Sequence, residues 1–305
     1  MRDRSRILKT VPELPEVEII AGDLRANIIG RKILDVHTDW PKYFRLPKSS
    51  AAFKACVAGR RITAVDRRGK NVLIHLTDGY LLLIHQKISG RLLVGNWRRV
   101  QDRKAGHTRW QPAPSLPGTP PSRGRFVHLL FDLDDGRQLG LSDLRKFGKA
   151  LCAKEAVIFD LPEMRNLGPE PLDPRFTFAR FDDLFAGRKG HIKQMLMNPN
   201  FIAGIGNLYS DEILYSAGIH PLTPLMHLQG AQLRALYDAM KRVLRRAIRL
   251  GGTAVDSPTA SGAETGYDRV RIVYQRAICP GGHAIERSKI GGRSAHFCPV
   301  EQQLF

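Results

Sequence analysis

Residues 12–18 read Pro-Glu-Leu-Pro-Glu-Val-Glu, and this segment requires a helix to start near the head of the chain. Proline has a fixed φ and lacks an N–H, so it is favoured in a first helical turn, where acidic side chains also complement the helix dipole. Apolar residues then recur at three- and four-residue steps, at Val17, Ile20, Leu24 and Ile28, and Gly30 closes the run. We therefore expect one amphipathic helix over residues 12–30.

The pattern changes from helical to β after this helix. Apolar runs at 72–76 and 80–85 flank Thr-Asp-Gly, and runs at 126–133 and 138–141 flank Asp-Asp-Gly. Two hairpins are predicted, because short turns rich in Asp and Gly join antiparallel strands. Residues 101–125, with five prolines between 111 and 121, read as a long surface loop and not as a strand.

The second half of the chain reads as helical. Helices are expected over 181–197, 207–217 and 231–250, and the last has an apolar stripe with its arginines elsewhere on the helix. Residues 268–305 read as a short β tail. The predicted fold class is α+β, with a mainly β first half and a helical second half joined near residues 155–175.

Charge and composition narrow the function classes. Lys and Arg number 48 against 29 Asp and Glu, a net charge of +19 that is typical of proteins that bind a polyanion. No run approaches 18 apolar residues and no signal peptide is recognisable, so we expect no membrane partner. Four cysteines are too few for a disulfide scaffold, which favours a reducing, cytoplasmic setting.

Pro12 and Glu13 together have the chemistry of covalent catalysis. A proline whose nitrogen is the chain terminus is a secondary amine, which can attack a sugar carbon and form an iminium intermediate. An adjacent glutamate can move the protons that this reaction requires. Taken alone, the pair is better explained as ordinary helix-start chemistry, so the catalytic interpretation depends on the rest of the chain.

Several ordered motifs favour the catalytic interpretation. Residues 12–18 resemble the amino terminus of the formamidopyrimidine-DNA glycosylase / endonuclease VIII family of base-excision repair enzymes. Further segments match the family in its own order: 68–70 (RGK), 85–90 (HQKISG), 143–148 (DLRKFG), 167–172 (LGPEPL), 204–209 (GIGNLY), 217–221 (AGIHP) and 292–299 (GRSAHFCP).

The resemblance implies an architecture and an activity. An N-terminal β-sandwich-like catalytic domain preceded by a helix is implied over 12–155, and a helix–two-turn–helix DNA-binding domain over 170–265. A terminal zinc-finger-like β-hairpin is implied over 268–305. The implied function is that of a bifunctional DNA glycosylase and apurinic/apyrimidinic lyase for oxidised purines such as 8-oxoguanine, acting as a monomer on damaged duplex DNA in the bacterial cytoplasm. A catalytically inactive damaged-DNA-binding paralogue and an endonuclease VIII-type enzyme for oxidised pyrimidines remain alternatives.

The matching positions assign expected roles to individual residues. The nucleophile would be Pro12, the proton-transfer acid Glu13, and a lysine contacting a phosphate near the lesion Lys70. Phosphate contacts are also expected at Asn207, which opens a helix, and at Arg293. The side chains expected to fill the void left by the flipped base are Ile88, Arg145 and Phe147, although the family usually has Met at the position of Ile88.

Two segments depart from the family pattern: the start of the chain, before Pro12, and the terminal hairpin. While residues 1–11 remain, the Pro12 nitrogen is a tertiary amide without a free lone pair. Valine is what a GUG start codon inside a longer frame would be read as, so we expect residues 1–11 to be a non-native or removed extension. The loop expected to read the lesion, 253–267, is glycine-rich and divergent.

The second departure is in the terminal hairpin. The family binds zinc with two Cys-x-x-Cys pairs, whereas only Cys279 and Cys298 are present here. We expect that the chemistry needs no cofactor and that the structural zinc is lost, because a structural site normally has four Cys or His ligands. The alternative is a mixed metal site with His283, His296 or Glu301 as substitute ligands.

Overall fold

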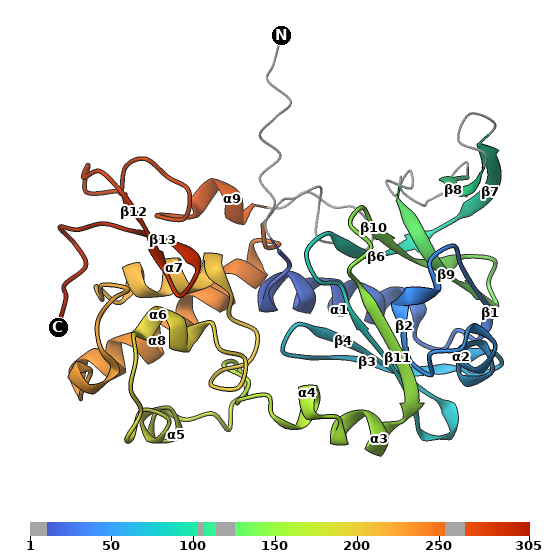
Figure 1. Cartoon of the computed structure of the whole chain (residues 1–305), viewed down its shortest axis with the longest axis horizontal. Helices are drawn as coiled ribbons and strands as arrows, with labels where there is room; N and C mark the ends of the chain where they lie inside the picture. Colours follow the sequence, from blue (N-terminus) through green and yellow to red (C-terminus); the bar gives the residue numbers. More distant parts are fainter. Residues whose placement is uncertain (1–10, 103–106, 114–125, 254–265) are drawn as a thin grey trace, which may run out of the picture. The chain divides into compact units, whose positions relative to one another are not determined.

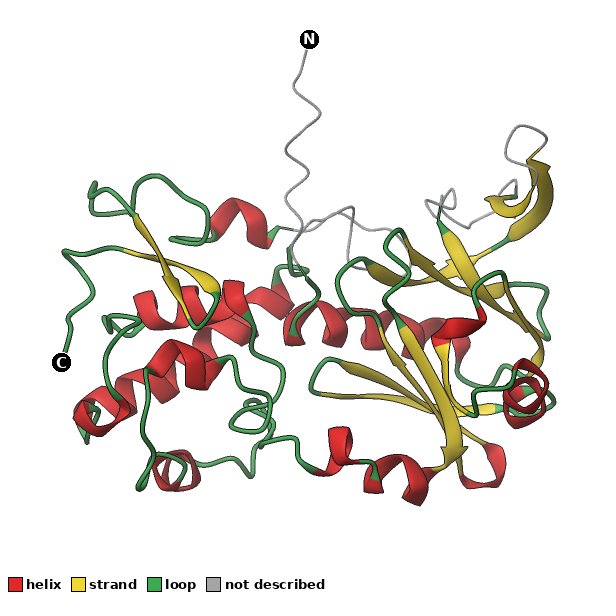
Figure 2. Ribbon diagram, viewed as in Figure 1, coloured by secondary structure: helices red, strands yellow, loops and turns green. Residues whose placement is uncertain are grey.

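The computed structural model describes residues 11–102, 107–113, 126–253 and 266–305. The chain forms two compact units, which Figures 1 and 2 show. Among the described residues, the first unit contains 11–12, those of Glu16–Arg165 and Thr253, and the second contains Glu13–Pro15, Asn166–Gly252 and Gly266–Phe305. The boundary between the units therefore falls inside the first turn of α1 (Leu14–Ile28).

The first unit is built on two sheets. One has the strand order β1 (Ile33–Thr38), β9 (Val127–Leu133), β10 (Gln138–Asp143) and β6 (Gly90–Gly95). The other has the order β2 (Phe44–Leu46), β11 (Lys149–Lys154), β5 (Tyr80–His85), β4 (Asn71–Leu76) and β3 (Ile62–Arg68), with only the β11–β2 pair parallel. Short helices complete the unit: η1 (Pro41–Tyr43), α2 (Ser50–Val57), η2 (Thr77–Gly79), α3 (Glu155–Asp160) and α4 (Pro162–Arg165).

The apolar stripe of α1 packs into the core of this unit. Val17, Ile20, Leu24 and Ile28 are at most 1% exposed and lie in one cluster with apolar residues of both sheets. Burying a side chain of this size stabilises the fold by roughly 1.5–3 kcal/mol. The helix predicted at 12–30 and the two predicted hairpins are confirmed, and the arrangement is β-sandwich-like.

The second unit is mainly helical and ends in a β-hairpin. Its elements are α5 (Phe178–Asp183), α6 (Ile192–Leu196), α7 (Asn207–Ser216), η3 (Leu225–His227), α8 (Ala231–Arg249), α9 (Tyr267–Val270), β12 (Glu286–Ile290) and β13 (Arg293–Phe297). The helices share one apolar core, and β12 pairs with β13 in antiparallel register. The helical half, the terminal hairpin and the α+β class are as predicted.

Two of the predicted elements are wrong. The single helix expected over 181–197 is interrupted between α5 and α6, where Gly187 and Gly190 adopt positive φ angles of 67° and 112°. These left-handed conformations suit glycine and end a helix.

Part of the expected loop 101–125 is a strand. β7 (Trp97–Asp102) pairs antiparallel with β8 (His107–Pro112), so residues 101–102 and 107–112 contradict the loop prediction. Trp97 is 5% exposed and belongs to a small cluster against which Trp110 packs, and this contact explains why the hairpin forms despite the nearby prolines. Residues 103–106 and 114–125 lie outside the described part of the chain. Among the described helices, none is both long and apolar enough to cross a membrane.

Candidate functional site

Pro12 and Glu13 immediately precede α1. The side chain of Pro12 is half-buried, whereas Glu13 is 4% exposed. A buried acid must find hydrogen-bond partners, because an unsatisfied buried carboxylate is strongly destabilising. The partners of Glu13 therefore define what this acid is positioned to do.

The Glu13 carboxylate is bound at the amino terminus of α7. Its Oε2 accepts hydrogen bonds from the backbone N–H of Gly206 at 2.6 Å and of Tyr209 at 3.4 Å, and its Oε1 accepts from that of Leu208 at 2.9 Å. The first N–H groups of a helix have no partner inside the helix, and the positive end of the helix dipole favours an anion there. The carboxylate is consequently fixed in one orientation beside Pro12 in the sequence.

Gly204 allows the backbone before α7 to approach the start of α1. Its φ is 87°, and a Cβ atom at this position would lie 2.7 Å from the Cβ of Leu14. The Leu14 N–H donates a 2.9 Å hydrogen bond to the Gly204 carbonyl. A glycine is required here for both reasons, because other residues are strained at this φ and would clash with Leu14.

Glu16 has a separate anchoring role in the first unit. Its Oε1 accepts hydrogen bonds from the backbone N–H of Thr253 at 3.0 Å and from the Thr253 hydroxyl at 3.1 Å. Glu16 thus fixes the residue from which the expected lesion-reading loop departs. The rest of that loop, apart from Gly266 and Tyr267, lies outside the described residues.

Lys70 lies in the turn between β3 and β4, with its side chain half-buried. Its charge acts on His85 at the end of β5: burial, followed by the positive charges of Lys87, Lys149 and Lys70, lowers the pKa of His85 to about 3. The Nδ1 atom of His85 accepts a 3.0 Å hydrogen bond from the Lys87 backbone N–H. A neutral histidine therefore lies within a group of three lysines.

Asp143 is a buried carboxylate beside the predicted site residues that the sequence did not single out. It ends β10, is fully buried and faces the loop between β5 and β6. Its Oδ1 accepts hydrogen bonds from the Ser89 hydroxyl at 2.5 Å and from the Arg145 N–H at 3.3 Å, and its Oδ2 accepts from the Gly148 N–H at 2.8 Å. The signal in the sequence was an acidic residue between a buried strand and an exposed loop.

These hydrogen bonds of Asp143, which we call the Asp143 clamp, tie together the two loops that carry the predicted void-filling side chains. We call those side chains, Ile88, Arg145 and Phe147, the wedge residues. The Ser89 hydroxyl also accepts a 3.0 Å hydrogen bond from the Arg145 N–H, so the loop that contains Ile88 is tied to the loop that contains Arg145 and Phe147. Phe147 is 48% exposed, and the Arg145 guanidinium carbon lies 4.7 Å from the centroid of its ring. An exposed apolar ring stacked with a cation on a clamped loop has the chemistry of a side-chain wedge for DNA.

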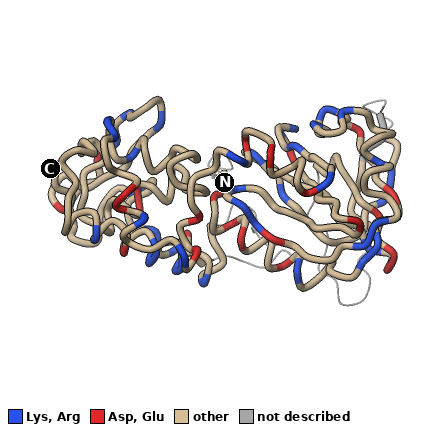
Figure 3. Tube along the Cα trace, turned by 90° about the horizontal axis from the view of Figure 1, so that it is seen from below, with Lys and Arg blue, Asp and Glu red and all other residues tan. Residues whose placement is uncertain are grey.

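Asn207 and Arg293, the two predicted phosphate contacts of the second unit, lie on adjoining segments. Asn207 is the first residue of α7, and its Nδ2 donates a 3.4 Å hydrogen bond to the hydroxyl of Ser294, the residue after Arg293. Arg293 is exposed at the start of β13 and, within the described part of the chain, forms no salt bridge. Figure 3 shows further Lys and Arg positions in both units.

His296 is occupied elsewhere and is not in the metal-binding group. Its backbone N–H and its Nδ1 each lie 3.0 Å from Oδ2 of Asp211, whose other carboxylate oxygen pairs with the fully buried Lys193. The candidate metal ligands that converge are instead Cys279, His283, Cys298 and Glu301, whose ligand atoms all lie within 4.8 Å of one another. A Cys/His group that could bind a metal is therefore present near the carboxyl terminus.

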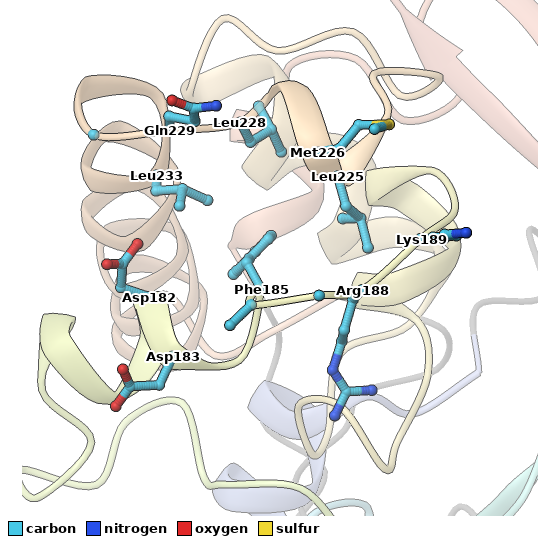
Figure 4. A pocket seen from close by; sticks show the side chains of 13 residues that line it. Asp182, Asp183, Phe185, Arg188, Lys189, Leu225, Met226, Leu228, Gln229 and Leu233 are labelled. Carbon is cyan, nitrogen blue, oxygen red and sulfur yellow. The ribbon is translucent and has the colours of Figure 1, made fainter.

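Figure 4 shows a separate pocket in the second unit. Its lining comes from the end of α5 and the loop after it, and from the segment that runs from η3 into the first turn of α8, and includes Asp182, Phe185, Arg188, Met226 and Leu233. None of the predicted site residues lines it. The pocket is thus not part of the site assembled above.

Comparison with known proteins identifies the class. The family model described as the formamidopyrimidine-DNA glycosylase N-terminal domain matches residues 11–150, and that described as the formamidopyrimidine-DNA glycosylase H2TH domain matches residues 167–259. The first match begins one residue before Pro12. Both domains in this order define a two-domain DNA repair enzyme.

Individual relatives agree with the family models. Formamidopyrimidine-DNA glycosylase of Moorella thermoacetica is 38% identical over 245 residues, covering 80% of this chain and 81% of the relative. The protein of the same name from Chloroflexus aggregans is 38% identical over 303 residues, covering 96% and 99%. The chain belongs to the formamidopyrimidine-DNA glycosylase family. Its function is that of a DNA glycosylase in base-excision repair.

Solved structures of the family share the fold. The Lactococcus lactis protein in complex with DNA containing an abasic site has a TM-score of 0.80 at 28% identity, covering 95% of this chain and 99% of that one. The same protein in complex with DNA containing an oxidised pyrimidine has a TM-score of 0.80 at 28% identity, covering 96% and 100%.

Proposed function

We propose that this protein excises oxidised purines, among them 8-oxoguanine and formamidopyrimidines, from duplex DNA and then cleaves the strand as an apurinic/apyrimidinic lyase. The observation that carries the proposal is the Pro12–Glu13 pair, with the Glu13 carboxylate bound by three backbone N–H groups at the start of α7. We further propose that it acts as a monomer in the bacterial cytoplasm.

Pro12 is the nucleophile in this proposal. Its nitrogen attacks C1′ of the lesion nucleotide, the bond from C1′ to the base breaks, and the base leaves with the bonding electrons and takes up a proton. The Pro12 nitrogen then loses its proton, the bond from C1′ to O4′ breaks and O4′ takes up a proton, which gives an iminium between Pro12 and the opened sugar. Loss of a proton from C2′ then allows the 3′ phosphate to leave. Each step requires Pro12 to be the first residue, because a nitrogen bonded to Val11 is an amide.

Glu13 moves the protons of these steps. Its backbone partners at α7 keep the carboxylate beside the proline in the sequence and out of bulk water. A positioned acid–base group of this kind accelerates proton transfer by roughly 10²–10⁴-fold. Lys70, in the first unit, binds a phosphate near the lesion with its positive charge.

The remaining residues bind and open the duplex. Asn207 and Arg293 contact phosphates, which fixes the register of the protein on DNA without reading the base. Ile88, Arg145 and Phe147 fill the space left by the flipped nucleotide. The Asp143 clamp supports this role because it holds both wedge loops in one arrangement.

The mechanism is tested by trapping the iminium. Protein that begins with Pro12 and protein that retains residues 1–11 are each incubated with an 8-oxoguanine duplex and sodium borohydride, which reduces an iminium to a stable amine. We expect a covalent protein–DNA product only from protein that begins with Pro12. Equal trapping of the two forms would exclude a terminal proline nucleophile.

A further inference from the structure

Three side chains near the carboxyl terminus form a closed triangle. The Cys279 Sγ lies 3.5 Å from the His283 Nδ1 and 3.3 Å from the Glu301 Oε1, and these last two atoms are 3.3 Å apart. Cys298 completes the group with its ligand atom within 4.8 Å of the others. Cys279 and Cys298 are 4% and 0% exposed, so both thiols are withdrawn from solvent.

These separations are those of ligands around one small cation. Zinc binds sulfur at about 2.3 Å, nitrogen at about 2.0–2.1 Å and carboxylate oxygen at about 2.0–2.2 Å in a tetrahedron. That geometry places sulfur about 3.5 Å from nitrogen or oxygen, and nitrogen about 3.4 Å from oxygen. The Cys279 thiol and the His283 ring each supply one proton, so hydrogen bonds explain two of the three short distances. A cation bound at the centre explains all three.

The backbone leaves room for this ligand set. A Cβ atom on Gly281 would lie 2.0 Å from the Glu301 Oε1 and 3.0 Å from the His283 Nδ1. The carboxylate and the imidazole therefore occupy space that any other residue at 281 would fill. The turn is closed by hydrogen bonds from the Cys279 N–H to the His283 carbonyl at 2.9 Å and from the Gly282 N–H to the Cys279 carbonyl at 3.0 Å.

Tyr215 of α7 orients the carboxylate. Its hydroxyl donates a hydrogen bond to the Glu301 Oε2, which leaves the Glu301 Oε1 facing the cysteine and the histidine. Outer partners of this kind fix the orientation of a ligand and tune its affinity for the metal. Tyr215 thereby ties the hairpin to the helix that begins at Asn207.

We propose that Cys279, His283, Cys298 and Glu301 bind one zinc ion, with Glu301 as a ligand through a single oxygen and Tyr215 as its positioning residue. The two missing cysteines of the family pattern are replaced by His283 and Glu301, contrary to the loss of zinc expected from the sequence. When bound, the ion links the turn before β12 to the turn after β13 and so fixes the hairpin on which Arg293 lies. The proposal does not depend on the role of Pro12.

Metal content tests the proposal directly. The full chain, purified under reducing conditions without chelator, is expected to contain one zinc per chain. Cobalt(II) exchange should give the thiolate-to-cobalt absorption of a site with two thiolates. Cys279→Ser should abolish both signals, whereas Cys56→Ser, a buried cysteine of the first unit, should leave both unchanged. Metal-free protein with reduced thiols and no cobalt spectrum would overturn the site and leave a hydrogen-bonded cluster only.

Two variants test the individual roles while the fold is monitored by circular dichroism. Tyr215→Phe should weaken zinc affinity about 10–100-fold in competition with a chelator, as loss of an outer partner does. Glu301→Cys should keep one zinc and strengthen the thiolate-to-cobalt band. Unchanged affinity in Tyr215→Phe would remove its positioning role, and an unchanged cobalt spectrum in Glu301→Cys would show that residue 301 is not a ligand.

Discussion

Glu13 in the second unit and Asp143 in the first are both buried carboxylates that accept three or more hydrogen bonds, but their donors differ. Glu13 accepts from three backbone N–H groups at the start of α7. Asp143 is held partly by side chains, the hydroxyls of Ser89 at 2.5 Å and Tyr43 at 3.5 Å. The Glu13 site follows from a helix terminus, whereas the Asp143 clamp depends on particular side chains.

The Glu13 carboxylate is thus positioned by backbone groups, whereas the Asp143 carboxylate is positioned partly by side chains. Any substitution at the start of α7 other than to proline leaves the backbone N–H in place, so the acid itself is the vulnerable element of that site. At the Asp143 clamp, either the acid or one of its hydroxyl partners can be removed. Burial and the Asp143 charge raise the pKa of Tyr43, so this phenol stays protonated and continues to donate.

The largest effect is expected for Glu13→Gln. The amide keeps the shape of the side chain, although its NH2 group must face at least one backbone N–H donor at α7. It cannot transfer protons, so the rate of base excision should fall roughly 10²–10⁴-fold. Binding to lesion DNA should be largely retained, and single-turnover excision and a binding titration measure the two quantities. Excision of the intact damaged base at a near-normal rate would contradict the assignment and reduce Glu13 to a cap of α7.

Loss of the Asp143 clamp should have a smaller effect, and on a different step. Asp143→Asn removes the charge and places an NH2 group opposite the backbone N–H of either Arg145 or Gly148, at a cost of about 1.5–3 kcal/mol of stability in the first unit. Excision from duplex DNA should fall more than cleavage at an abasic site, which is cheaper to open. A milder variant is Ser89→Ala, which removes one donor to Asp143 and one acceptor of the Arg145 N–H and should lose about 1 kcal/mol. Equal losses on both substrates would indicate a packing role only.

One phosphate contact from each unit can be compared through salt dependence. Lys70→Met and Arg293→Met should each weaken binding to any duplex and reduce the slope of log K against log salt by roughly one unit. Asn207→Ala should weaken binding with little change in slope, because its side chain is neutral. If the Lys70 or Arg293 variant keeps both its affinity and its salt slope, that residue does not contact a DNA phosphate.

The comparison also shows what a sequence can predict. Pro12, Glu13 and the wedge residues are predicted from contiguous motifs, and the helices and hairpins are predicted from hydrophobic periodicity. The contacts of Glu13 with Gly206 and Leu208 join positions nearly 200 residues apart, and no local pattern encodes them. The role of Asp143 was missed because its partner Ser89 lies in another loop. The break between α5 and α6 was missed because isolated glycines inside an apolar pattern do not show whether a helix continues.

The smallest expected effect is a pH dependence of stability, and it is confined to the first unit, which contains Asp143. His85 precedes the loop held by Asp143, and burial and the neighbouring lysines lower its pKa to about 3, against about 6.5 in an unfolded chain. Below pH 6.5 His85 binds a proton in the unfolded chain but not in the folded unit, so the free energy of unfolding decreases as the pH falls towards 3. Between pH 7 and 5.5 this linkage removes about 1 kcal/mol. Hydrogen exchange should show the added opening in peptides spanning 80–90 but not in those of α7, and His85→Asn should abolish the difference. Equal pH sensitivity in both segments would mean that the effect does not arise from His85.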